Sequence, residues 1–407
     1  MEFRHDGEAV VAEAGEPIAF ALIAEGRLPI ARSPKLHRPR GPYCLRGGCD
    51  GCLARVNGSP DVMTCLRRAV GGERVETQNV VGSRSVDMLR AADFLFPKGI
   101  DHHRLFAGVR GVSGVVQSFA RRVAGLGKLP DTTLAPRKAE HRLLDVLVVG
   151  GGASGLTLAR ELGNRAVLVD DGPALGGTCK GLDPVRAAQL VEEARASGAE
   201  LRAETTIVGL FREPERADGR LHALAVGPQG ATLFVPRVTV LATGRHDAVL
   251  AFGENDLPGI YSARAALGLF AAGIGLGARV VLVGSGRAGA AFVEKTAGSI
   301  EVVSVAESEL VRAMGRSRVT RVVVKREHEL EIRADAVVVD GPGSPASELA
   351  IQAGGEVDYD ALEGYRLRRD DDGRVGAGLY ALGSLTGAGA GRVDVAATAR
   401  ALLRALG

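Results

Sequence analysis

The chain has 407 residues, which at about 150 residues per domain predicts two or three domains. Its 46% hydrophobic and 24% charged residues are typical of a globular protein and exclude wholesale disorder. A net charge of +3, 4% aromatic residues and no tryptophan argue against a nucleic-acid partner. The 56 glycines are about twice the usual share of roughly 7%, and their positions carry information.

Nothing in the sequence predicts a membrane span or a secretory leader. The uncharged apolar run from Ala265 to Ala278 has 14 residues, whereas a membrane helix needs about 20. The first residues, Met1 to Asp6, lack the apolar segment of a signal peptide. We therefore expect a cytoplasmic protein, in which clustered cysteines indicate a metal site and not disulfides.

Four of the five cysteines predict an iron–sulfur cluster. These metal-ligand candidates are Cys44, Cys49, Cys52 and Cys65. The first three have the C-x4-C-x2-C spacing of plant-type ferredoxins, which hold a [2Fe–2S] cluster through four thiolates. Structural zinc is the alternative, but zinc ribbons usually pair two C-x2-C units and this sequence has one.

The surrounding residues predict a small β-grasp domain. Asn57-Gly58 is the dipeptide of a tight hairpin, which would join strands at 53–56 and 61–64 and return Cys65 towards Cys52. Pro17 suits the first position of a helix. Basic residues near the loop either stabilise a reduced cluster or form a solvated or docking face; they are Arg27, Arg32, Lys35, Arg38, Arg40 and Arg46.

A dinucleotide-binding turn follows the buried strand expected at 146–149. Its G-x-G-x-x-G motif and the start of the next helix comprise Gly150, Gly152, Ala153, Ser154 and Gly155. Asp170 ends the strand expected at 166–169, at the distance typical of a ribose-binding acid. The glycines permit the tight turn, the approach of a pyrophosphate and the close packing of the helix. We expect a bound adenine dinucleotide here, with a structural remnant as the alternative.

A second glycine turn is a weaker signal. Residues 284–289 repeat the motif after a strand expected at 280–283. The next strand, expected at 301–305, ends at Ala306, and Glu307 comes one place late for a ribose-binding acid. A structural remnant and a working NAD site both remain open for this turn.

Further motifs resemble the two-dinucleotide-domain flavoproteins of the pyridine-nucleotide disulfide oxidoreductase-like group. The matching segments are Leu241 to Gly244, Gly176-Gly177 and Gly378 to Gly383. Residues 33–41 and 255–259 are similar to a narrower family, the α subunit of heterotetrameric sarcosine oxidase with the hydrogen cyanide synthase and opine oxidase subunits. Residues 93–99 and 124–127 also resemble that α subunit.

The resemblance implies an α/β fold: a Rossmann-type two-dinucleotide-binding-domain flavoprotein with an N-terminal β-grasp [2Fe–2S] ferredoxin-like domain. The expected division is 1–105 for the β-grasp domain, 106–142 for a connector, 143–255 with 370–407 for the FAD- or NAD-binding domain, and 256–369 for a second, NAD-like domain. The implied further cofactor-binding residues are Gly177, Thr178, Thr243, Gly244, Gly383 and Ser384. FAD-binding members carry an aspartate at position 384, so both FAD and NAD remain candidates at the first turn.

The resemblance implies an electron-transfer or cofactor-binding subunit of an amine, amino-acid or opine dehydrogenase or oxidase complex. It would pass electrons between a flavin and the cluster, with an FAD-dependent amine or amino-acid oxidase-type subunit as its partner. No catalytic residue is assigned, and Cys179 lacks the second cysteine that dithiol chemistry needs. Two alternatives remain: a self-contained NAD(P)H-dependent reductase, and a non-catalytic scaffold with a structural dinucleotide.

Overall fold

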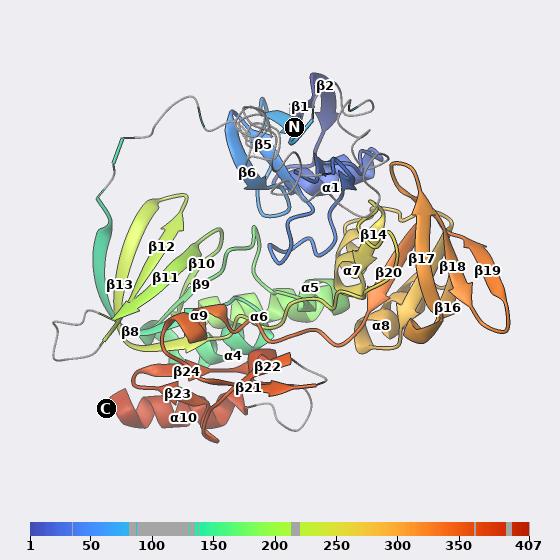
Figure 1. The fold of residues 1–407 in the computed structure, drawn as a ribbon. Coiled ribbons are helices and arrows are strands. Elements are labelled where there is room, and N and C mark those ends of the chain that lie inside the picture. Colours follow the sequence, from blue (N-terminus) through green and yellow to red (C-terminus); the bar gives the residue numbers. More distant parts are fainter. Residues whose placement is uncertain are drawn as a thin grey trace, which may run out of the picture.

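The computed structural model describes residues 1–34, 36–80, 138–212, 220–361, 364–387 and 393–406, together with residues 87, 130, 135 and 136. Most of the expected connector, and the segments 93–99 and 124–127, lie outside these residues. Figure 1 shows the amino-terminal elements in blue above helices α5 and α7, between the large sheet in green and the yellow and orange elements of a second sheet.

The amino-terminal unit is a five-stranded sheet in the order β2-β1-β7-β5-β6, in which β1 and β7 are parallel. Its elements are β1 (Glu2–His5), β2 (Glu8–Val11), α1 (Ile18–Ala24), β5 (Leu53–Val56), β6 (Ser59–Met63) and β7 (Arg74–Thr77), with the small pair β3 (Ala31–Arg32) and β4 (Pro39–Arg40). The expected hairpin is present, since Asn57 and Gly58 have φ angles of 49° and 82°. Pro17 directly precedes α1 instead of occupying its first position.

The largest sheet has eight strands, and its central strands are parallel. The strands are β8 (Glu140–Val149), β9 (Ala166–Val169), β10 (Glu200–Arg202), β11 (Thr206–Arg212), β12 (Leu221–Gly227), β13 (Gly230–Leu241), β23 (Arg374–Gly376) and β24 (Leu379–Ala381). Its helices are α4 (Ala153–Leu162), α5 (Cys179–Leu182), α6 (Pro184–Ala196) and α10 (Val395–Leu406), with short 3-10 turns at Gly163–Arg165 and Gly383–Thr386. Because β24 pairs with β13, the end of the chain returns to the first dinucleotide turn.

A second parallel sheet has the order β14-β20-β15-β16. Its elements are β14 (Ile260–Ser262), α7 (Ala263–Ala271), β15 (Arg279–Gly284), α8 (Arg287–Thr296), β16 (Glu301–Val305) and β20 (Ala336–Asp340). An antiparallel sheet covers one side of it, built from β17 (Leu310–Gly315), β18 (Val319–Lys325) and β19 (Glu329–Arg333), with a 3-10 turn at Glu307–Glu309. The chain then forms α9 (Glu348–Gln352) and the hairpin β21 (Val357–Asp360) and β22 (Gly364–Leu367) before returning to the large sheet.

The amino-terminal unit and the second parallel sheet share one apolar core. Phe3, Ile18 and Leu22 belong to the same buried cluster as Leu269 and Phe292. Burying side chains of this size stabilises the contact by about 1.5–3 kcal/mol each, so the two units are held together by the hydrophobic effect. The described part of the chain contains no helix long and apolar enough to cross a membrane.

Candidate functional site

The four ligand cysteines form two close pairs. Cys44 and Cys49 share a hydrogen bond, and so do Cys52 and Cys65. In each pair this shared bond is the largest influence on both thiols. It raises the pKa values of Cys44 and Cys65, lowers that of Cys52, and lowers that of Cys49 to about 6. Three of the thiols are buried and Cys49 is half-buried.

This pairing fits two irons better than one zinc ion. Among the described residues, no three histidine, cysteine or carboxylate side chains gather closely enough to hold a single metal ion. A structural zinc ion needs four ligands around one centre, whereas a [2Fe–2S] cluster takes two thiolates on each iron. The thiol pairs therefore match the cluster's requirement.

The loop around the cysteines turns its backbone towards sulfur. The amide of Gly48 donates to Sγ of Cys44 at 3.2 Å. Leu45 and Gly47 have φ angles of 55° and 78°, the left-handed conformation that glycine adopts most easily. A Cβ atom on Gly51 would lie 2.1 Å from the carbonyl oxygen of Gly41, so the loop closes only with glycine there. Amide donation to sulfur is one of the means by which proteins tune cluster potentials.

The first glycine turn leaves an open helix N-terminus. Gly150 has φ 113°, and a Cβ atom there would meet the carbonyl oxygen of Ala242 at 2.4 Å. A Cβ atom on Gly155 would lie 1.9 Å from the carbonyl oxygen of Gly150, so α4 packs directly on the turn. Gly152 begins α4 without a side-chain cap, and a Cβ atom there would meet nothing within 4 Å. The free amides and this open space suit a pyrophosphate.

Carboxylates stand at the ribose end of this turn. Asp170 accepts the amides of Gly151 at 2.6 Å and Gly172 at 2.9 Å, which fixes its orientation. Desolvation raises the pKa of the neighbouring Asp171 to about 6, and the negative charge of Asp170 adds to this shift. Desolvation also lowers the pKa of Lys180, whose Nζ donates to the carbonyl oxygen of Ala174 at 2.6 Å.

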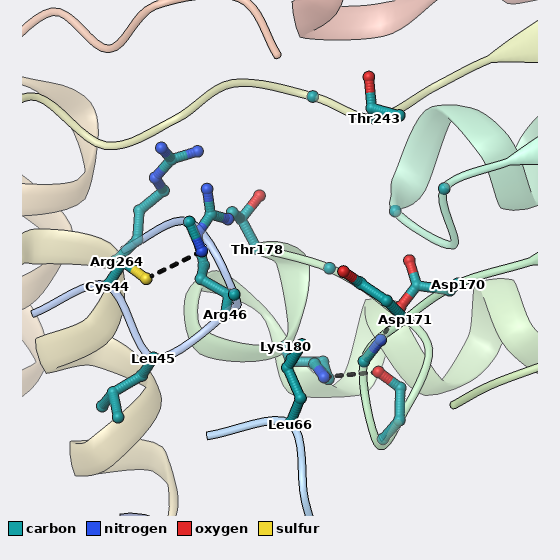
Figure 2. Close-up of a pocket in the computed structure, with 18 of the residues that line it drawn as sticks. Cys44, Leu45, Arg46, Leu66, Asp170, Asp171, Thr178, Lys180, Thr243 and Arg264 are labelled. Carbon is teal, nitrogen blue, oxygen red and sulfur yellow. Dashed lines mark hydrogen bonds between the residues drawn. The ribbon is translucent and has the colours of Figure 1, made fainter. Parts of the chain in front are cut away.

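The cluster loop and the dinucleotide turn line one cavity of about 710 Å³. Figure 2 shows Cys44 and Arg46 on one side of it, Asp170 and Asp171 on the other, and Thr178 and Lys180 between them. The predicted residues at its wall are Gly150, Gly152, Ala153, Ser154, Asp170, Gly177, Thr178, Thr243, Gly244, Gly383, Ser384, Cys44 and Cys65. Gly155 does not line the cavity and lies behind the turn, where it supports α4.

Ser384 and its neighbour Gly383, near the carboxyl terminus of the described chain, also line the cavity. A Cβ atom on Gly244 would lie 3.7 Å from Oγ of Ser384. A Cβ atom on Gly383 would lie 2.5 Å from Oγ of Ser154, so these two residues approach each other closely. Thr243 donates its hydroxyl to the carbonyl oxygen of Ala346 at 2.8 Å. A serine hydroxyl can hydrogen-bond a ribityl or ribose hydroxyl, but it lacks the charge of an aspartate.

Sequence reasoning missed the cluster domain's contribution to the dinucleotide cavity. Arg46, Leu66 and Arg68 come from the amino-terminal unit, yet they line the same cavity as Asp170. His246 also lines it, and its Nε2 lies 2.7 Å from Oε1 of Glu348. Motif spacing could not reveal these neighbours, because they are distant in the sequence.

Of the alternatives for the basic residues near the loop, a solvated face does not fit the described arginines. Arg27 pairs with Glu8 and Glu25, Arg32 is buried beside Asp87, and Arg38 and Arg40 pair with Asp256. Of the described members of that group, only Arg46 lines the cavity. Lys35 lies outside the described residues. The described cations are therefore engaged in ion pairs, and Arg38 and Arg40 join the amino-terminal unit to Asp256.

Comparison with known proteins agrees with this geometry. Residues 1–80 match the family described as 2Fe-2S iron-sulfur cluster binding domain. Sarcosine oxidase subunit alpha of Rhizobium meliloti (strain 1021) is 28% identical over 191 residues, which cover 44% of this chain and 19% of the relative. The same subunit of Corynebacterium sp. (strain U-96) is 27% identical over 264 residues, covering 60% and 23%. Parts of the chain are therefore similar to sarcosine oxidase subunit alpha.

One solved structure has the same fold over nearly the whole chain, and another has it over about two thirds. The crystal structure of L-proline dehydrogenase from P. horikoshii matches with a TM-score of 0.70 at 20% identity, covering 95% of this chain and 69% of that one. An NAD-dependent persulfide reductase from A. fulgidus matches with a TM-score of 0.53 at 18% identity, covering 65% and 59%. The expected [2Fe–2S] domain and two-dinucleotide-domain flavoprotein fold are confirmed. The curated relatives are much longer, since the matches span about a fifth of their length.

Proposed function

We propose that this chain is the electron-transfer and cofactor-holding subunit of a multi-subunit amine, amino-acid or opine dehydrogenase or oxidase. The observation that carries the proposal is the shared cavity, in which Cys44 and Cys65 border the space beside the first glycine turn. A bound flavin supplies two-electron chemistry and a [2Fe–2S] cluster supplies one-electron transfer, so a site that holds both can connect a substrate oxidation to an acceptor.

The chain's own residues would hold the two groups in place. The open amides at Gly152 would bind a pyrophosphate, Asp170 would orient a ribose, and the cysteine pairs would hold the cluster. FAD is the proposed dinucleotide, supported by the flavoprotein fold, with NAD as the alternative because Ser384 replaces an aspartate. The alpha-subunit likeness supports a hetero-oligomer with an amine-oxidising partner, and a cytoplasmic location remains part of the proposal.

The oxidised substrate would bind on the partner subunit. In the described cavity, Asp247 is engaged by both Arg46 and Arg264, which leaves it poorly placed as a general base. Sarcosine, proline, glycine and opines are the candidate substrate class, and the names of the similar proteins support the first two. These compounds share an amine carbon from which a flavin can remove a hydride.

An anaerobic absorption spectrum tests the proposal. We expect flavin bands together with a broad iron–sulfur absorption that dithionite bleaches and added NADH does not. Cys52→Ser should lose the iron–sulfur absorption, while Cys179→Ser, away from the cluster, should keep it. Bleaching by NADH alone would favour the self-contained reductase. If dithionite reduces the flavin and the cluster but a substrate-reduced partner subunit does not, the scaffold alternative is favoured. A colourless protein that contains zinc would overturn the central claim.

A further inference from the structure

The two glycine turns have the same construction, so their residues can be matched by position. A Cβ atom on Gly150 would lie 2.4 Å from the carbonyl oxygen of Ala242, at the end of the neighbouring parallel strand. A Cβ atom on Gly284 would lie 2.3 Å from the carbonyl oxygen of Asp340, at the end of its own neighbouring strand. Ala242 and Asp340 therefore occupy equivalent places, one beside each turn.

The last glycine of each motif supports this match. A Cβ atom on Gly155 would meet Cβ of Ala242 at 3.5 Å, and a Cβ atom on Gly289 would meet Cβ of Asp340 at 3.1 Å. The two side chains therefore point at the start of the following helix in the same way. In the first turn this side chain is a methyl group, and in the second it is a carboxylate.

The carboxylate fills the space that stays open in the first turn. A Cβ atom on Gly286 would lie 2.8 Å from both oxygens of Asp340, whereas one on Gly152 would meet nothing within 4 Å. The amide of Gly289 donates to Oδ2 of Asp340, and the amide of Gly286 also hydrogen-bonds this carboxylate. The N-terminal amides of α8 thus already bind an anion, and that anion belongs to the chain.

We propose that Asp340 closes the second glycine turn to adenine dinucleotides by taking the place of their pyrophosphate. A bound pyrophosphate would need the same amides and the same space, and it would face a like charge at contact distance. Glu307 adds to this repulsion, since its Oε1 lies 3.3 Å from the position of a Cβ atom on Gly284. The second dinucleotide-type unit would then serve as a packing and docking body and not as an entry point for NADH.

The inference concerns the second turn alone and holds whether or not the chain is part of an amine-oxidising complex. A double-mutant comparison of four proteins tests it: wild type, Ala242→Asp, Asp340→Ala and the double variant. Equilibrium dialysis with NADH, together with the nucleotide retained after purification, counts the adenine dinucleotides on each protein. Far-ultraviolet circular dichroism and the cluster absorption check that each variant is folded.

We expect about one dinucleotide on wild type, none on Ala242→Asp, two on Asp340→Ala and one on the double variant. The Ala242→Asp substitution places in the first turn the carboxylate that closes the second. If Ala242→Asp does not fold, the Asp340→Ala protein decides alone: a gained NADH site supports the inference, and unchanged binding overturns it. NADH bound to a folded Ala242→Asp protein that keeps Asp340 also overturns it, because one of the two turns would then bind a dinucleotide despite its carboxylate.

Discussion

Nε of Arg46 lies 3.2 Å from Oδ2 of Asp247, so an ion pair joins the cluster loop to the segment that follows β13. Arg46 also donates to the carbonyl oxygen of Arg245 at 2.7 Å. The side chain of Asp247 is 6% exposed, and its other oxygen, Oδ1, lies 2.5 Å from Nε of Arg264. The cation is thus fixed at the cavity wall, two residues from a cluster ligand.

Arg46→Ala should lower the reduction potential of the cluster. A reduced cluster carries one more negative charge, which a nearby fixed cation stabilises. Removing the cation should therefore lower the reduction potential by on the order of tens of millivolts. Asp247 stays paired with Arg264, and the fold should survive. Potentiometric titration measures the change. Arg74→Ala, which removes an exposed cation from the same unit, is the matched control. An unchanged or raised potential in Arg46→Ala would contradict the assigned role.

Gly152→Ala and Gly155→Ala should separate binding from stability. The methyl group at position 152 would enter open space without touching the protein, so stability should change by less than about 1 kcal/mol. It would occupy the place of the pyrophosphate, and dinucleotide affinity should fall at least about tenfold. At position 155 the methyl group would lie 1.9 Å from the carbonyl oxygen of Gly150 and should destabilise the fold itself.

Urea denaturation and dialysis of the same preparations measure both effects. The assignment fails if Gly152→Ala binds the dinucleotide as wild type does, or if it loses as much stability as Gly155→Ala.

Local patterns in the sequence were sufficient for the elements that carry the motifs. Strands β9 and β16 have the expected bounds, since valine-rich runs that end at turns define them; β9 is fully buried, and in β16 Val305 is buried. The hairpin at Asn57-Gly58 followed from the positive φ angles that its turn requires. By contrast, β8 begins at Glu140, inside the expected connector, because its first residues lack the apolar run that marks the rest.

The shared cavity depended on contacts that no local pattern encodes. Arg46 and Asp247 are 201 positions apart in the sequence, and only the tertiary fold brings them together. The second glycine turn also depends on a contact that its local motif does not encode. Its motif leaves a structural remnant and a working NAD site both open, whereas the hydrogen bond from the Gly289 amide comes to Asp340, 51 positions further along the chain. Motif spacing describes the backbone of a site and says little about which distant side chain enters it.

Glu200 should contribute stability that disappears in acid. Hydrogen bonds from Arg142 and then Arg202 lower its pKa from 4.5 to about 2, partly offset by desolvation. A depressed folded-state pKa stabilises the fold above the unfolded value near 4.5, and this benefit is lost as the pH falls towards 2. Because Glu200 is partly exposed, Glu200→Gln should cost only up to about 1 kcal/mol at pH 7.

The difference in unfolding free energy between wild type and Glu200→Gln should shrink between pH 7 and pH 3.5, as measured by urea denaturation. Glu192→Gln, which disrupts an exposed pair with Arg195 on α6, should leave stability unchanged at both values. A difference for Glu200→Gln that grows in acid would exclude the arginine pairing as its cause.

Asp171 should make dinucleotide binding at the first turn dependent on pH. Its pKa, raised to about 6 by desolvation and by Asp170, means that the side chain loses its negative charge between pH 7 and pH 5. A neutral Asp171 repels the anionic dinucleotide less, so its affinity for the cavity should rise as the pH falls through about 6. ADP-ribose is a suitable probe for cofactor-stripped protein, because its pyrophosphate diester does not titrate in this range. The Asp171→Asn variant should bind more tightly at pH 7 and lose most of the pH dependence, whereas Asp145→Asn, outside the cavity, should keep it. The same slope in wild type and Asp171→Asn would assign the effect to another group.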